Sequence, residues 1–219
     1  MNSNPQDGTL VKKYGLALHT ASRELGLAIS NFAGDSRCQT WNLDRDLATH
    51  LHQYLVEFIG PQTWGDLAFI AVAKGPGGFT GTRMGMVTAR TLAQQLDIPV
   101  FAVSTLAAVA CSSSKKSISN QEMALQMPAQ RGQLFGAVYS VNKDLGLTEL
   151  FPDTVMTPES WHEKLDNWGN SYQLIEVGSE LGWSVSSVLE LAYLEWQMGS
   201  RPDWSDALPF YGQHPVKGH

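Results

Sequence analysis

The sequence predicts an α/β fold made of two lobes, each with the element order β-β-β-α-β-α. Apolar runs with the length of buried strands alternate with segments of helical periodicity. The order of the first half recurs in the second half, in pattern and not in letters, and a serine-rich polar segment separates the two. We therefore predict a flexible tail at 1–13, an N-terminal lobe at 14–111, a serine-rich loop at 112–121 and a C-terminal lobe at 122–219.

Composition sets the broad class of the protein. The chain has 219 residues, of which 43% are hydrophobic and 16% are charged, and this balance is typical of a globular protein. Its net charge of −6 is not typical of a nucleic-acid binder, so we expect contact with RNA to be indirect. The two cysteines form no C-x-x-C, and no run of 18 apolar residues occurs. We expect a cytoplasmic protein that does not enter a membrane.

The elements of the first half follow from these patterns. A hairpin joins the first two strands, and leucines at helical spacing define the first helix, which ends at Gly60-Pro61. The predicted elements are strands at 14–20, 25–30 and 38–43, a helix capped by Asp44 or Asp46 that ends at Ile59, a strand at 67–73, a helix at 86–96, a strand at 100–103 and a helix at 105–111 capped by Ser104.

The second half repeats this order. A turn at 128–132 joins its first two strands, and Thr157 precedes a proline at the first helical position. The predicted elements are strands at 122–126, 134–141 and 147–151, a helix at 158–165, a strand at 174–178 and a helix at 185–198 that Gly199 ends.

The segment 75–85 (GPGGFTGTRMG) is the most informative stretch, because it joins a buried strand to a helix through a tight turn. Its glycines permit positive φ and close approach to the backbone. Gly75, Gly77, Gly78 and Thr80 stand where a phosphate could meet the helix N-terminus. A Walker A loop requires a lysine that is absent here, and G-x-G-x-x-G does not fit either. The segment is therefore either a tight packing turn, which we favour, or a phosphate cradle.

Gly81, Gly85, Ala89 and Ala93 recur every four residues and line one face of the helix that follows the turn. Small side chains let a second helix approach closely. The pattern fits a helix of the same chain and a partner subunit equally well.

The sequence contains no recognisable catalytic or metal site. Neither H-x-x-x-H, H-E-x-x-H nor G-x-S-x-G occurs. His19 ends the first strand without a titratable neighbour in sequence, which favours a structural role. Arg83 and Arg90 could hold an anion or a partner carboxylate, although such arginines are more often solvated.

The segment 72–85 (VAKGPGGFTGTRMG), together with Ile98-Pro99-Val100 and 103–106 (VSTL), closely resembles the TsaB family of bacterial tRNA threonylcarbamoyladenosine biosynthesis proteins. That family is glycoprotease-like and has the actin/Hsp70/sugar-kinase superfold. The resemblance extends over 14–110, is weaker over 127–139, where Ala129, Gly132 and Phe135 match the second-lobe hairpin, and is faint beyond.

The resemblance implies two ribonuclease-H-like lobes of the actin-like ATPase (ASKHA) superfold. It also implies that the chain binds the catalytic subunit TsaD, which attaches threonylcarbamoyl to the adenosine next to the anticodon, and that the ATPase TsaE completes the assembly. In the family, the helix after the glycine turn packs with the first helix against the partner. Carried onto this chain, the interface becomes Gly81, Arg83, Gly85, Ala89 and Ala93. We also expect that the chain alone can pair with itself through this surface, as a homodimer.

Three departures from the family favour a non-catalytic subunit. The first strand ends in His19-Thr20 instead of Asp-Thr, and the aspartate and arginine of the second-lobe turn fall on Pro128 and Gln130. Ser104 and Ala108 stand where the catalytic relative has a histidine pair. Because proline and histidine cannot replace aspartates that position a metal-bound phosphate, we expect no cofactor and no bound ATP. The phosphate loop of Gly75, Gly77, Gly78 and Thr80 would then be vestigial.

The alternatives are an ATP-dependent phosphotransferase of the same superfold and a glycoprotease-like peptidase. If the small residues form the interface, Gly85→Leu or Ala89→Arg should leave the fold intact and abolish co-purification with TsaD.

Overall fold

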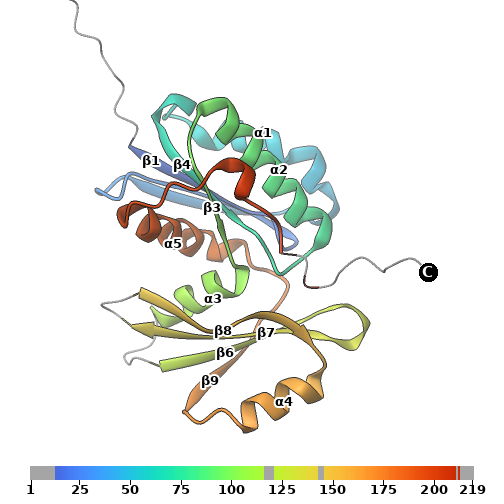
Figure 1. Cartoon of the computed structure of the whole chain (residues 1–219). Helices are drawn as coiled ribbons and strands as arrows, with labels where there is room; N and C mark the ends of the chain where they lie inside the picture. The colour runs from blue at the N-terminus through green and yellow to red at the C-terminus, as the bar shows by residue number, and fades with distance from the viewer. Residues whose placement is uncertain (1–12, 116–120, 143–145, 211, 213–219) are drawn as a thin grey trace, which may run out of the picture.

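The computed structural model describes residues 13–115, 121–142, 146–210 and 212, and it has two α/β lobes (Figure 1). Nearly all of the predicted tail at 1–13 and the centre of the predicted loop, 116–120, lie outside these residues. The helices and strands are β1 (Tyr14–His19), β2 (Glu24–Ser30), β3 (Ser36–Asn42), α1 (Leu47–Ile59), β4 (Leu67–Ala73), α2 (Phe79–Leu96), β5 (Val100–Val103), α3 (Thr105–Ser114), β6 (Gln121–Pro128), β7 (Leu134–Asn142), β8 (Gly146–Met156), α4 (Pro158–Asp166), β9 (Tyr172–Glu176) and α5 (Val185–Gln197).

The two sheets confirm the predicted fold class and the repeated element order. The first sheet has the strand order β3-β2-β1-β4-β5, and the second has β8-β7-β6-β9. In each sheet, three antiparallel strands are followed by a parallel strand next to the first one. Every residue of β4 is buried, because helices cover both faces of the first sheet. This burial explains why β4 appears in the sequence as an unbroken apolar run.

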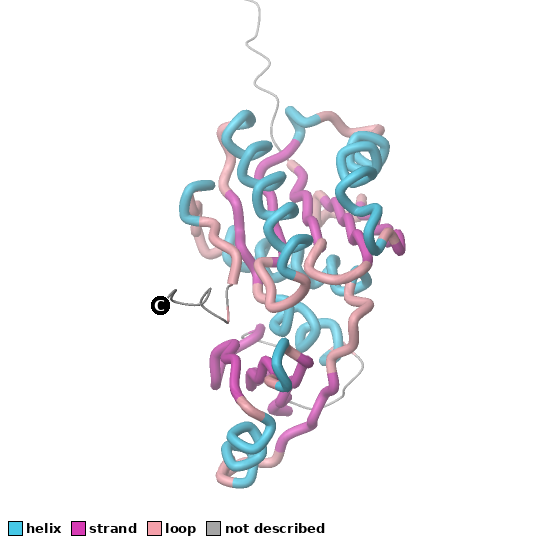
Figure 2. The backbone as a smooth tube through the Cα atoms, turned by 90° about the vertical axis from the view of Figure 1, so that its right-hand side faces the viewer, coloured by secondary structure: helices cyan, strands magenta, loops and turns pink. Residues whose placement is uncertain are grey.

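Three helices cover the first sheet, and one of them comes from the second half of the chain (Figures 1 and 2). α1 and α2 pack on one face through Leu51, Leu55 and Met86. α5 packs on the other face, where Val188 and Leu189 join the core around Phe69. The predicted boundary of the C-terminal lobe at 122–219 is therefore wrong for α5, which belongs to the first lobe by packing.

α3 makes the opposite exchange. It follows β5 in sequence, but its apolar residues, including Leu106 and Val109, join the core of the second sheet. Ser112 to Ser114 belong to this helix and not to the predicted serine-rich loop. The chain thus crosses between the lobes at α3 and again before α5, and each half contributes a helix to the other half's core.

Most helix ends agree with the predicted caps. The Ser104 hydroxyl accepts the N–H of Ala107 at 3.1 Å, and the Thr157 hydroxyl accepts the N–H of Ser160 at 3.2 Å. The predicted aspartate cap of α1 is wrong, because Asp46 precedes the helix without a side-chain capping bond and a 3-10 turn at Asp44–Asp46 comes first.

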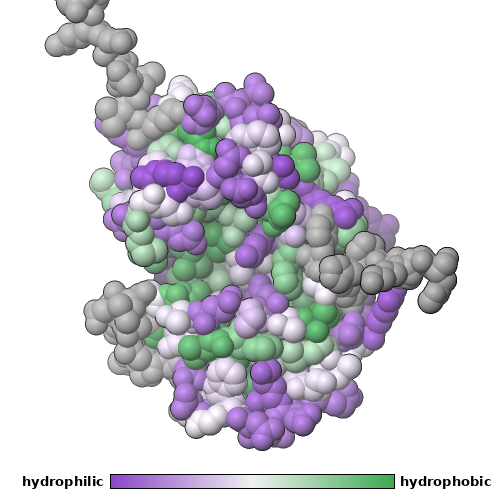
Figure 3. Space-filling model, viewed as in Figure 1, coloured by the Kyte–Doolittle hydropathy of each residue, from purple (hydrophilic) through white to green (hydrophobic). Residues whose placement is uncertain are grey.

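No helix within the described residues is long and apolar enough to cross a membrane. In the view of Figure 3, hydrophobic side chains gather along the waist where the lobes meet, whereas the outer surface of the upper lobe is mainly hydrophilic.

Candidate functional site: the cleft between the lobes

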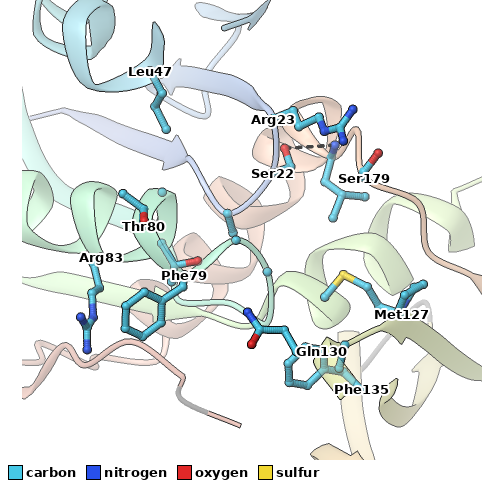
Figure 4. Close-up of a pocket in the computed structure, with 18 of the residues that line it drawn as sticks. Ser22, Arg23, Leu47, Phe79, Thr80, Arg83, Met127, Gln130, Phe135 and Ser179 are labelled. Atoms are coloured by element: carbon cyan, nitrogen blue, oxygen red, sulfur yellow. Dashed lines mark hydrogen bonds between the residues drawn. The ribbon is translucent and has the colours of Figure 1, made fainter. Parts of the chain in front are cut away.

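A cleft of about 1290 Å³ lies between the lobes, and it is the candidate site (Figure 4). Both lobes line it, so its shape depends on how they are joined. The lining comes from the β1–β2 turn (Ala21, Ser22, Arg23), the start of α1 (Asp44, Arg45, Leu47, Ala48), residues 77–84 at the start of α2, residues 127–131 and Phe135 of the second-lobe hairpin, the segment after β9 (Val177, Gly178, Ser179, Leu181), and Phe210 and Gly212 near the C-terminus.

Hydrogen bonds at one side of the cleft join the segment before α5 to the β1–β2 turn and the start of β2. The Leu181 N–H donates to the Ser22 hydroxyl at 3.3 Å, and the Gly182 N–H donates to the Glu24 carboxylate at 2.9 Å. The Arg23 N–H donates to the Ser179 carbonyl at 3.4 Å. The segment before α5 therefore fixes the second lobe to the β1–β2 turn.

The glycine turn packs against its own chain. The Gly78 N–H donates to the Ala21 carbonyl at 2.7 Å, so this N–H is already used and is not available to a phosphate. A Cβ on Gly77 would collide with that carbonyl oxygen. Gly75 is buried and has a φ of +96°, which favours glycine. Thr80 is exposed at the cleft wall. Close packing thus accounts for the glycines of the predicted phosphate loop.

The small residues of α2 also face inward. Ala89 and Ala93 are fully buried in the first lobe's core. A Cβ on Gly85 would collide with the Thr20 hydroxyl, and a Cβ on Gly81 would collide with the Thr20 carbonyl. The chain's own β1 end therefore occupies the groove that these side chains leave. The expectation that they dock a partner does not fit this structure for Gly85, Ala89 and Ala93, because these three residues are buried. Gly81 is half-buried and lines the cleft.

Arg83 is the exception among the predicted interface residues. It is exposed on the outer face of α2, and its guanidinium lies 3.7 Å from the ring centroid of Phe79. The Phe79 and Val87 side chains share this face and are 56% and 63% exposed. The outer face of α2 is thus a mixed apolar and cationic surface.

The cleft lining is strongly cationic for a chain of net charge −6. Four of the seven arginines of the chain line it, whereas Asp44 is the one acidic residue among the described residues that line it. Arg23 lies 4.0 Å from Asp44, and both side chains are exposed, so this pair offsets little of the charge. The other lining arginines are Arg45, Arg83 and Arg131.

His19 is fully buried and does not line the cleft. Desolvation lowers the pKa of its imidazole to about 4, so the ring is neutral at pH 7. Its two ring nitrogens have no hydrogen-bond partner among the described residues. Pro128 and Gln130 do line the cleft, so one of the three departures from the family pattern, that of the second-lobe turn, lies at its wall. Within the described ranges, no group of three His, Cys, Asp or Glu side chains could hold a metal ion.

A family model described as "TsaD: tRNA N6-adenosine threonylcarbamoyltransferase" matches residues 59–173, just over half of the chain. The chain belongs to the TsaD family. This match includes the glycine turn and the second-lobe hairpin, which are the two main walls of the cleft.

Curated relatives of this TsaD-family chain are described as tRNA threonylcarbamoyladenosine biosynthesis protein TsaB, as the sequence resemblance predicts. The protein from Bacillus subtilis is 38% identical over 100 residues, which are 46% of this chain and 42% of the relative. The protein from Escherichia coli K12 is 28% identical over 120 residues, 55% of this chain and 50% of the relative. The chain thus spans about half the length of these relatives in its matches.

Solved structures extend the likeness over nearly the whole fold. A Pseudomonas aeruginosa protein described as similar to the peptidase YeaZ superposes with a TM-score of 0.76 at 21% identity, covering 92% of this chain and 100% of that one. YeaZ from Pseudomonas aeruginosa superposes with a TM-score of 0.74, also at 21% identity, covering 90% and 100%. These neighbours show that the TsaD-family chain shares their fold.

Sequence reasoning missed two groups of residues in this TsaD-family chain. Arg45 and Arg131 lie in short turns without a motif, and only the fold brings them to one cleft. Asp153 in the middle of β8 accepts hydrogen bonds from Ser104 at 2.6 Å and Tyr139 at 2.8 Å. Burial raises the pKa of the Asp153 carboxyl and that of the Tyr139 hydroxyl. No local signal predicts this network, because Ser104 and Asp153 are distant in sequence.

Proposed function

We propose that this chain is a non-catalytic, cytoplasmic subunit in tRNA threonylcarbamoyladenosine biosynthesis. It binds and stabilises a catalytic subunit of the TsaD type, which modifies the adenosine next to the anticodon. The TsaB relatives support the pathway. The observation that carries the non-catalytic role is the cleft, which is large enough for a ligand but has a single acidic residue in the part of its lining that the structure describes.

The composition of the cleft argues against phosphoryl transfer by this chain. Such reactions need carboxylates that hold metal ions against the phosphates. Of the described lining residues, Asp44 alone carries a carboxylate, and it lies near Arg23. The alternative of an ATP-dependent phosphotransferase rests on the same cleft. Calorimetry with ATP and magnesium distinguishes the two, because micromolar binding with hydrolysis would favour the phosphotransferase.

The outer face of the α1–α2 layer is the proposed docking surface for the TsaD-type subunit. It carries Phe79, Val87 and, on α1, Val56, which are 56%, 63% and 63% exposed. Phe79 and Val87 lie two turns apart on one face of α2, and exposed apolar side chains that gather in a contiguous patch mark interaction surfaces. The resemblance implied that the first helix and the helix after the glycine turn bind the partner, and this proposal retains both helices. It places the contact on their outer face and not on the small residues of α2. A TsaE-type ATPase would complete the assembly, and without a partner the same face would pair two copies of this chain.

The test of the function is the nucleoside content of tRNA. We expect that depleting this chain from its source cells lowers N6-threonylcarbamoyladenosine in bulk tRNA, measured by mass spectrometry of digested nucleosides. Re-expression of the wild-type chain should restore the level. Unchanged modification after complete depletion would contradict the proposal.

A further inference from the structure

The cleft is lined by exposed arginines from both lobes, and a subunit that acts only through protein contacts does not require them. Its arginines come from both lobes: Arg45 precedes α1, and Arg131 lies in the turn between β6 and β7. Both side chains are exposed, and neither forms an ion pair with a described residue. Two exposed cations therefore face one cleft from opposite walls, on a molecule whose overall charge repels polyanions.

Aromatic rings accompany these cations. Phe79 and Phe135 line the cleft, and Figure 4 shows them on either side of Gln130. Phe79 carries a stacked guanidinium, that of Arg83, at 3.7 Å from its ring centroid. Single-stranded nucleic acids are bound by such a combination, in which cations track the phosphates and aromatic or guanidinium planes stack on the bases.

We propose that the cleft between the lobes binds a single-stranded segment of RNA, with Arg45 and Arg131 contacting its phosphates. The expectation from net charge, that RNA contact is indirect, is thereby replaced, because the charge of the cleft and not that of the whole chain governs the contact. The choice of RNA over another polyanion rests on the proposed function in tRNA modification.

The aromatic lining of the cleft favours a single strand over a paired one. Unpaired bases can stack on Phe79 and Phe135, whereas the bases of an A-form helix are already stacked within the duplex. Arg131 has a φ of 59° in the turn of the hairpin and lines the wall of the second lobe. A single strand can therefore use both the cations and the rings of the cleft, whereas a duplex presents mainly its phosphates to them.

The test is fluorescence anisotropy of the full chain with a labelled single-stranded RNA of about 12 nucleotides. Arg45→Gln combined with Arg131→Gln should weaken binding about tenfold at low salt. The slope of log K against log salt should fall by about 1.4, which corresponds to two lost phosphate contacts. Lys164→Gln on α4, outside the cleft, removes one charge and should bind as the wild type does. An unlabelled duplex of the same length should compete poorly.

Equal binding by the double variant and the wild type, or equal competition by the duplex, would overturn the inference. Each variant is also titrated with the purified TsaD-type subunit. Loss of RNA binding with retained subunit binding supports the RNA site. If the double variant instead loses the subunit and keeps RNA, the cleft is a protein contact and the inference fails, whereas the proposed function stands. If neither the wild-type chain nor any variant binds the subunit, the proposed partner role is wrong, whatever the result for RNA.

Discussion

At the residue scale, His19 shows what a buried titratable group does to stability. Its pKa in the folded chain is about 4, below the ordinary value of 6.5, because burial disfavours the charged imidazolium. Between these values the unfolded chain takes up a proton and the folded chain does not. The stability is therefore complete above pH 6.5 and declines as the pH falls from 6.5 towards 4.

We predict that the free energy of unfolding falls by about 2 kcal/mol from pH 7 to pH 5 through His19 alone. His19→Leu should remove this part of the pH dependence, as measured by urea unfolding at both pH values. His52→Gln, an exposed position on α1, is the matched control and should keep the wild-type slope. An unchanged slope in His19→Leu would show that another group titrates.

Gly85 has no side chain, and this allows α2 to approach the end of β1 at Thr20 closely. The Thr20 hydroxyl donates to the Gly81 carbonyl at 2.8 Å, and this contact occupies the space beside Gly85. Larger residues at Gly85 or Ala89 should therefore disturb folding, so the substitutions expected from the sequence to test docking do not test it.

We predict that Gly85→Ala lowers the free energy of unfolding by about 1–3 kcal/mol, because the added methyl group collides with Thr20. Gly169→Ala, where nothing lies within 4 Å, should stay within about 0.5 kcal/mol of the wild type. Combining Gly85→Ala with Thr20→Ala should recover part of the loss in a double-mutant cycle. Strict additivity of the two changes would argue against this contact.

At the scale of elements, a single hydroxyl at the N-terminus of α3, that of Ser104, both caps the helix and bonds to the second sheet. Ser104 caps the helix by accepting the Ala107 N–H, and it donates to Asp153 of the second sheet at 2.6 Å. A half-buried carboxylate such as that of Asp153, when it loses one of its donors, keeps part of the cost of desolvation without compensation. The cap therefore also stabilises the packing of α3 on β8.

We predict that Ser104→Ala costs about 2–3 kcal/mol of unfolding free energy, the sum of a lost cap and a lost hydrogen bond to a half-buried carboxylate. Thr157→Ala removes the cap of α4, whose hydroxyl is exposed, and should cost about 1 kcal/mol. Thermal and urea unfolding of the two variants give the comparison. Equal losses would show that the Asp153 contact adds nothing.

The order of helices and strands could be predicted from the sequence. Two predictions were wrong, the start of α2 and the lobe to which α5 belongs, because hydrophobic periodicity reports neither close backbone packing nor which sheet a helix covers. α2 begins at Phe79 and not at Met86, because Gly81 and Gly85 reduce the helical signal but fit the close contact with Thr20. The apolar stripe of α5 predicts a buried face without saying which sheet covers it. The cleft arginines had no signal at all, since their proximity arises from the fold.

At the scale of the whole molecule, the exchange of α3 and α5 between the halves couples the two lobes. α5 completes the core of the first sheet, and α3 completes that of the second. Neither half of the chain can therefore bury its sheet alone. The arrangement gives one body with a cleft between the lobes and an outer α1–α2 face. The two surfaces that the proposals use meet at Phe79 and Arg83.

The central claim is that this outer face binds a TsaD-type subunit, and a calorimetric titration with that purified subunit tests it most directly. The account predicts that the wild-type chain binds and that Val87→Asp weakens binding at least about tenfold, as a charge in the centre of an apolar contact does. Met198→Asp changes a side chain that is 78% exposed at the end of α5, on the other side of the sheet, and should bind like the wild type. Equal affinity for Val87→Asp and the wild type, or no binding by the wild-type chain, would contradict it.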